Sequence, residues 1–144
     1  MSQRITAGTN ERHFQTMMQH KASDVRLLGK RRFASGEVEI SVDQSLEHNG
    51  TEYLIEIDSA NMAKVLVGQY VLLNQLHTKR DKTPFFLVVH TYKNYNPQRT
   101  LNNLRMINKT LYGGAGIEFG AVHLTGLSDW KVGFSEFLSL ISRA

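Results

Sequence analysis

The sequence has no cysteine and only two prolines among its 144 residues. The lack of cysteine excludes disulfides, cysteine-ligated zinc sites and thiol nucleophiles, and it fits a reducing compartment. No apolar run reaches the roughly 18 residues that a membrane-spanning helix needs. The first residues, MSQRITAGTNERHF, lack the apolar centre of a secretory signal. These absences favour a protein of the cytoplasm or the nucleoid over a secreted or membrane protein.

A moderate excess of positive charge is present instead. Lysine and arginine number 17 against 13 acidic residues, which gives a net charge of +4 and a pI near 9.5. Such an excess favours phosphate-bearing partners, although an ordinary solvated surface explains the same count. Basic and aromatic residues gather in the stretches VRLLGKRR and HTYKNYNPQRT, where we expect contacts with DNA or RNA from Lys30, Arg31, Arg32, Lys93, Tyr95 and Arg99.

The length suits one domain covering residues 1–144, and no repeat or linker divides it. Hydrophobic periodicity predicts helices over 10–21, 59–76, 96–109 and 133–144, and strands over 24–34, 38–43, 53–58, 84–92 and 117–124. Asn10 and Asn96 are the expected N-caps, with Pro97 at the first helical position. The run PFFLVVHTY is apolar throughout, which is typical of an internal parallel strand. We therefore predict an α/β or α+β fold with a central mixed sheet flanked by helices.

Asn49-Gly50 is the strongest turn signal in the chain, because a type I′ hairpin turn needs positive φ at both central residues. A two-residue turn at this point would pair His48 with Thr51. Counting outward, Glu47 faces Glu52, Asp43 faces Glu56 and Ser41 faces Asp58. On this register Val42, Leu46, Tyr53, Ile55 and Ile57 share one face of the hairpin. The opposite face carries Asp43, Glu56 and Asp58.

Like charges that oppose each other across a hairpin destabilise the pair. Exposure to water, a shared proton or a bound cation would relieve the repulsion. Water can screen Glu47 and Glu52 near the turn, so an acidic pair alone proves little. Asp43 and Glu56 lie farther from the turn, where the apolar segment 59–76 should cover the sheet. Carboxylates without histidine or cysteine suit a hard ion such as Mg²⁺, with Mn²⁺ as a substitute.

An Asp-bearing strand, an Asn-Gly hairpin, a second strand with Glu56-Ile57-Asp58, and an apolar helix with GQY together resemble the PD-(D/E)xK nuclease superfamily. The resemblance covers roughly residues 10–92 and implies a restriction-endonuclease-like α-β-β-β-α-β core. It implies that Asp43 and Glu56 bind the metal and that Asp58 stands where the family has lysine. Glu11 would match the first-helix Glu of many members, and Gln69 the Gln that packs near their site.

The missing lysine leaves alternatives open. Lys64, in the first turn of the expected helix, would reach back to the site, or Asp58 would be a third metal ligand or part of an inactive site. The resemblance implies a Mg²⁺-dependent DNA endonuclease of restriction, homing or repair type, and a homodimer or higher oligomer if both strands are cut. The alternatives are an inactive nucleic-acid-binding or assembly subunit of the same fold and a plain protein–protein module.

The six histidines give a weaker signal. His13 and His20 lie two turns apart on one expected helix face, and we read them as surface residues. His90 and His123 each fall at the end of an expected strand, where side chains often border sites. A hydrogen-bonded core histidine is the more common role at such positions, and we expect it here.

Overall fold

The computed structural model describes residues 7–60, 63–77 and 81–143. A five-stranded mixed sheet in the order β3-β4-β5-β6-β7 forms its centre. The parallel strands β4 (Thr51–Asp58), β5 (Thr83–His90) and β6 (Glu118–His123) lie in the middle. The short antiparallel strands β3 (Gln44–His48) and β7 (Ser142–Arg143) form the two edges. This is the α+β fold class that the sequence predicts.

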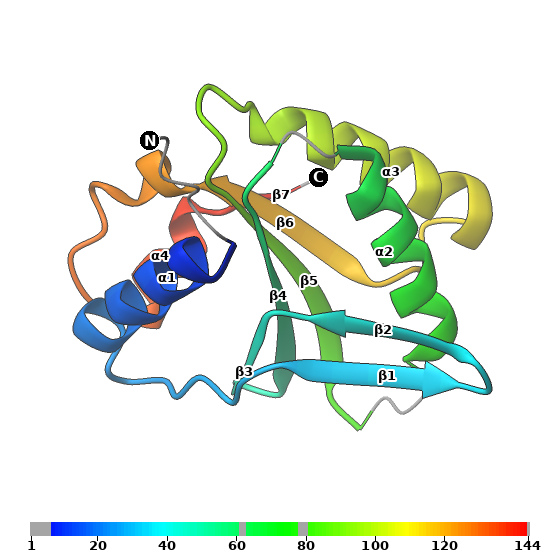
Figure 1. The fold of residues 1–144 in the computed structure, drawn as a ribbon, viewed down its shortest axis with the longest axis horizontal. Coiled ribbons are helices and arrows are strands. Elements are labelled where there is room, and N and C mark those ends of the chain that lie inside the picture. The colour runs from blue at the N-terminus through cyan, green and yellow to red at the C-terminus, as the bar shows by residue number, and fades with distance from the viewer. Residues whose placement is uncertain (1–6, 61–62, 78–80, 144) are drawn as a thin grey trace, which may run out of the picture.

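Helices cover both faces of this sheet (Figure 1). On one face lie α1 (Ala7–Lys21) and α4 (Phe134–Leu140), whose Phe14 and Phe137 pack against the sheet. On the other face lie α2 (Ala63–Leu76) and α3 (Pro97–Tyr112), which contribute Tyr70, Leu101 and their neighbours to a second core. Because helices cover both faces of β5, nearly all of its side chains are buried, which explains why its apolar run is not interrupted. None of the described helices is long and apolar enough to cross a membrane.

A separate two-stranded hairpin of β1 (Arg31–Ser35) and β2 (Val38–Val42) extends from the edge of the sheet and packs against α2. This feature corrects the expected hairpin. The strand before the Asn-Gly turn is broken at Asp43, so that β2 pairs with β1 and only β3 pairs with β4. Ser41 therefore faces Arg32 and not Asp58. Val42 packs in the α2–α3 core, away from Leu46, because the bend turns its side chain to the other side.

The register near the turn is the predicted one. His48 pairs with Thr51, Glu47 with Glu52 and Gln44 with Ile55. Asn49 and Gly50 have φ values of 51° and 79°, as a type I′ turn requires. We expected water to screen Glu52, and this expectation is wrong. It is buried and binds Arg31 at 3.1 Å and His77 at 2.8 Å.

The structure confirms some of the predicted helix and strand boundaries and corrects others. Asn96 caps α3 by accepting a hydrogen bond from the Gln98 N–H at 2.9 Å, and Pro97 follows it as predicted. Asn10 is not a cap, because α1 already begins at Ala7. The expected strand 24–34 is reduced to β1, and the expected final helix ends at Leu140 before β7. The first residues expected in the helix 59–76 include 61–62, which lie outside the described residues.

Candidate functional site

The bend at Asp43 brings two carboxylates together. The Glu56 Oε1 atom accepts a hydrogen bond from the Asp43 backbone N–H at 3.2 Å. In return, the Asp43 Oδ2 atom accepts one from the Ile57 N–H at 2.8 Å. Because β2 turns away at this point, the outer edge of β4 has no strand partner beyond Ile55, and the Asp43 side chain takes the place of one. Each acid thus satisfies a backbone group beside the other acid.

Burial and mutual repulsion make this pair electrostatically strained. Burial, followed by the charge of Asp43 and a side-chain hydrogen bond with it, raises the pKa of Glu56 to about 8. The Gln69 amide opposes this increase by donating to Glu56 Oε2 at 2.8 Å. No lysine, arginine or histidine of the described residues forms an ion pair with Asp43 or Glu56. Water, a shared proton or a bound cation could each relieve the repulsion between the two acids. For Glu56, a proton or a cation from outside the chain remains.

Glu11 lies on α1 beside this pair. Burial, followed by the negative charge of Asp43, raises the pKa of the Glu11 carboxyl, while Lys30 acts in the opposite direction. Glu11 is therefore close enough to Asp43 to feel its charge, and Lys30 is close enough to Glu11 to stabilise it. The sequence assigned Lys30 to nucleic-acid contacts only. Its place near the acids was missed because no local pattern connects residue 30 with residue 11.

Gln69 of α2 binds both sides of the bend. Its Nε2 group donates to Glu56 Oε2 and, at 3.1 Å, to the Ser41 carbonyl oxygen. The helix thus fixes the Glu56 side chain relative to the departing strand β2. The expected location of Gln69 near Asp43 and Glu56 agrees with this geometry.

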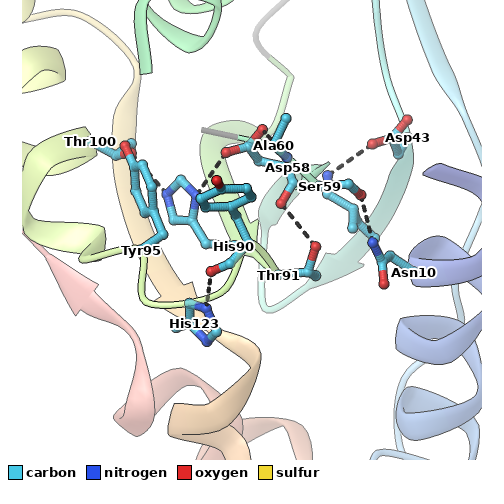
Figure 2. A network of polar contacts seen from close by, with 12 residues as sticks. Asn10, Asp43, Asp58, Ser59, Ala60, His90, Thr91, Tyr95, Thr100 and His123 are labelled. Carbon is cyan, nitrogen blue, oxygen red and sulfur yellow. Dashed lines mark hydrogen bonds and ion pairs between the residues drawn. The ribbon is translucent and has the colours of Figure 1, made fainter. Parts of the chain in front are cut away.

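Asp58 takes part in a different network (Figure 2). Its Oδ2 atom is 3.0 Å from His90 Nδ1, and His90 Nε2 is 2.8 Å from the Thr100 hydroxyl. That hydroxyl is in turn 3.0 Å from the hydroxyl of Tyr95, whose ring stacks on His90 with centroids 4.2 Å apart. No described contact links Asp58 with Asp43 or Glu56. Asp58 and His90 are register partners on the parallel strands β4 and β5. This pair could have been predicted from the sequence only if the pairing of these two strands had been known.

Lys64, the expected substitute for the missing lysine, is exposed in the first turn of α2 and makes no ion pair with a described residue. His90 is fully buried and hydrogen-bonded, as expected of a core histidine. His123 is also satisfied. One ring nitrogen is 2.7 Å from the Tyr92 carbonyl oxygen, and the other accepts from the Thr125 N–H.

No group of three or more His, Asp or Glu side chains within the described residues is arranged to hold a metal ion. The oxygen atoms of Asp43 and Glu56 nevertheless fit Mg²⁺, which is usually bound through one or two carboxylates while water and substrate phosphates fill its other positions. Zinc and copper favour imidazole or thiolate ligands. No described histidine forms an ion pair with Asp43 or Glu56, and the sequence has no cysteine. These two carboxylates would therefore suit a hard ion better than a soft one.

The residues expected to bind nucleic acid fall into two groups. Lys30, Arg31 and Arg32 lie at the base of the β1–β2 hairpin, where Arg31 is bound to Glu52. Lys93 and Tyr95 line a hollow of about 560 Å³ at the carboxyl ends of β5 and β6, together with Thr91 and Thr125. Tyr95 is only 6% exposed and belongs to the His90 network, so it is placed for packing rather than for a surface contact. Arg99 covers the Tyr95 ring at 5.6 Å.

A groove of about 490 Å³ runs between β2 and α2, and Glu56 and Gln69 reach its wall. We call it the β2–α2 groove. The carboxylate pair is thus connected to an open recess on its α2 side.

Comparison with known proteins leaves the family open. No known family and no curated protein matches the sequence. Among solved structures, the chain is similar to one described as "Protein of Unknown Function AF1548", with 14% sequence identity and a TM-score of 0.46. The similarity covers 92% of this chain and 65% of that one.

Proposed function

We propose that this protein is a Mg²⁺-dependent DNA endonuclease of the PD-(D/E)xK kind, in which Asp43 and Glu56 bind the ion. The observation that carries the proposal is the carboxylate pair itself, which lies half-buried where β2 leaves the sheet and forms no ion pair with a lysine, arginine or histidine of the described residues. Burying two like charges is costly, and the cost falls once a divalent ion replaces the proton on Glu56.

The residues around the pair have separate roles in this proposal. Asp43 and Glu56 hold the ion, and Glu11 accepts hydrogen bonds from its outer water shell. Gln69 keeps the Glu56 carboxylate oriented. A bound Mg²⁺ would supply Lewis-acid activation of the phosphodiester and of the attacking water. Lys30 or Lys64 would balance the charge in place of the lysine that the family has at position 58.

DNA would be held by the basic residues beside this site. Lys93 and Arg99 lie beyond the carboxyl end of β5, which is the edge where open parallel sheets bind ligands. Arg32 and Lys30 lie on the hairpin side. Contacts to phosphates position a duplex without reading its sequence, and they should weaken steeply with salt. Cleavage of both strands would require two copies of the chain.

Nicking of supercoiled plasmid tests the proposal. Asp43→Asn and Glu56→Gln should each lower the nicking rate in Mg²⁺ or Mn²⁺ by more than about 100-fold, since even the loss of an outer-sphere partner of a metal ligand costs about 10–100-fold. Glu47→Gln is the matched control, because it removes a partly exposed acid of the same hairpin that lies nearer the turn. Equal nicking by all four proteins would assign the activity to a contaminant and reject the site.

A second function is favoured by one observation. Asp58 stands where the family has lysine, and it is bound to His90 instead of facing the pair. The chain would then be a catalytically inactive member of the fold that binds nucleic acid or assembles with a partner. Salt-dependent DNA binding without nicking in Mg²⁺, Mn²⁺ or Co²⁺ would support this alternative.

A further inference from the structure

The β2–α2 groove has walls of a different character from those of a phosphate site. Its sides are formed by the apolar residues Ile40, Val65 and Leu72, and polar groups of Ser41, Glu56 and Gln69 lie along it. Among the residues that the structure describes, no lysine or arginine lines it, and Glu39 adds a second acid. The groove therefore disfavours an anion and favours a neutral group with apolar faces.

Gln69 presents a free acceptor in this groove. The side chain is only 6% exposed, and its Nε2 group donates to Ser41 and Glu56. Because the Ser41 carbonyl oxygen can only accept, the amide orientation is fixed with its nitrogen on that side. Among the described residues, none donates to Gln69 Oε1. This oxygen is not among the fully enclosed atoms that lack a partner, so it is open to the groove, where water or the N–H group of a ligand can donate to it.

We propose that the β2–α2 groove binds a nucleobase of the substrate strand, with Gln69 Oε1 accepting a hydrogen bond from a base N–H. This inference rests on the proposed function, because Glu56 belongs both to the groove and to the carboxylate pair. The base next to the scissile phosphodiester is the neutral part of the substrate nearest to that pair. Every nucleobase has at least one N–H donor and a flat face that packs against apolar side chains.

Gly68 keeps the groove open. It lies on the exposed side of α2, and a Cβ atom added to it would meet nothing within 4 Å. Glycine is among the least favourable residues in a helix interior. Its presence here leaves the space between Val65 and Leu72 free. Residue 68 thus allows the groove to be filled without disturbing the core.

Binding of a short dye-labelled single-stranded DNA in EDTA tests the proposal. Gly68→Leu, which places a side chain in the groove, should weaken binding about tenfold or more, whereas the matched Gly68→Ala should bind within about twofold of the natural protein. An oligonucleotide with abasic sites should bind the natural protein about as weakly as intact DNA binds Gly68→Leu. Circular dichroism confirms that both variants fold.

A second measurement does not depend on any variant. In ¹H–¹⁵N spectra, intact single-stranded DNA should shift the Gln69 side-chain NH₂ and the amides of Val65 and Gly68 more than abasic DNA does. Equal binding by Gly68→Leu and the natural protein, or groove signals that DNA leaves unchanged, would overturn the proposal. A concentration-dependent dimer that Gly68→Leu disrupts without DNA would also overturn it, by assigning the groove to a second copy.

A negative result in the binding test can be distinguished from a negative result in the nicking test. Metal-free binding in the groove remains measurable if the protein cuts nothing, and nicking that depends on Asp43 remains measurable if the groove is empty.

Discussion

Replacing Glu56 by Gln should change how stability depends on pH. The pKa of Glu56 is raised from 4.5 to about 8 in the folded protein, first by burial and then by Asp43. Between these two values the unfolded chain has lost its proton while the folded chain still holds it. Unfolding therefore releases a proton, and stability falls as pH rises through this window. Below pH 4.5 the site contributes no pH dependence, because both states are protonated.

The expected size follows from the shift. Each pH unit in the window costs about 1.4 kcal/mol, so the natural protein should lose roughly 4–5 kcal/mol from this site between pH 4.5 and 8. Glu56→Gln keeps a neutral side chain of the same shape, but it has one acceptor oxygen in place of two, so it cannot accept from both Asp43 N and Gln69 Nε2. Because the new side chain does not titrate, the free energy of unfolding of the variant should lack the fall between pH 4.5 and 8 that Glu56 causes in the natural protein. The variant should be about 1–3 kcal/mol less stable than the natural protein near pH 4.5, because one hydrogen bond is lost, and it should exceed the natural protein at pH 8 and above.

Urea unfolding followed by circular dichroism at pH 5, 6, 7, 8 and 9 measures the difference. Glu47→Gln is the control, because this partly exposed carboxylate should leave the slope with pH unchanged. Adding Mg²⁺ at pH 8 should stabilise the natural protein, by about 2.7 kcal/mol at 100 times the dissociation constant, and should leave Glu56→Gln unaffected. Parallel pH profiles for Glu56→Gln and the natural protein would refute the reasoning about the buried pair.

Three further substitutions test the rest of the structure by urea or thermal unfolding. His90→Phe retains the ring stack on Tyr95 but leaves buried Asp58 without its partner, so it should cost about 3 kcal/mol, and adding Asp58→Asn should recover part of the loss. Gly120→Ala should cost about 1–3 kcal/mol, because its Cβ would lie 2.9 Å from the Phe85 ring, and an unchanged melting temperature would contradict this packing. Asn96→Ala should cost about 1 kcal/mol through the lost cap, whereas Asn96→Asp should retain most of the stability.

Local signals in the sequence predicted the turn at Asn49-Gly50 and the start of α3. In both cases the responsible residues are adjacent and have backbone preferences that few others share. Asn49 and Gly50 adopt the positive φ values that the turn needs, and Pro97 fits the first turn of a helix. The register from Gln44 to Ile55 follows from the turn alone, because each residue farther from the turn has one fixed partner.

The break at Asp43 could not be predicted in the same way. Alternation of apolar and polar residues shows that a segment is extended, but it does not show which strand is its partner. Val38, Ile40 and Val42 alternate as expected, yet they pair with β1, and of the three only Ile40 and Val42 pack beneath α2, whereas Val38 is exposed. The bend moves Val42 from the face of Leu46 to the opposite core. A choice between two partner strands depends on long-range packing, which a single sequence does not display.

The site shows the same division. The proximity of Asp43 and Glu56 was predicted because the turn fixes their distance along the hairpin, and Gln69 was added because GQY resembles the helix of the nuclease family. Asp58 was grouped with them only by its position on the same strand. Its side chain binds His90, a residue 32 positions later on the neighbouring parallel strand. Whether an acid faces a site or a core histidine is decided by the strand order, which the sequence left open.

A purely structural role for Asp43 and Glu56 explains their hydrogen bonds but not their charges. The two backbone N–H groups at the splayed end of the hairpin need acceptors, and asparagine or glutamine side chains would supply them without repulsion. The chain has two carboxylates there instead, and a third acid, Glu11, feels the charge of Asp43. Neutral acceptors would be the more stable solution at neutral pH. A half-buried Glu56 that holds its proton near neutral pH beside the Asp43 carboxylate could give that proton up to a divalent ion, and an amide at this position could not, which supports the proposed ion site.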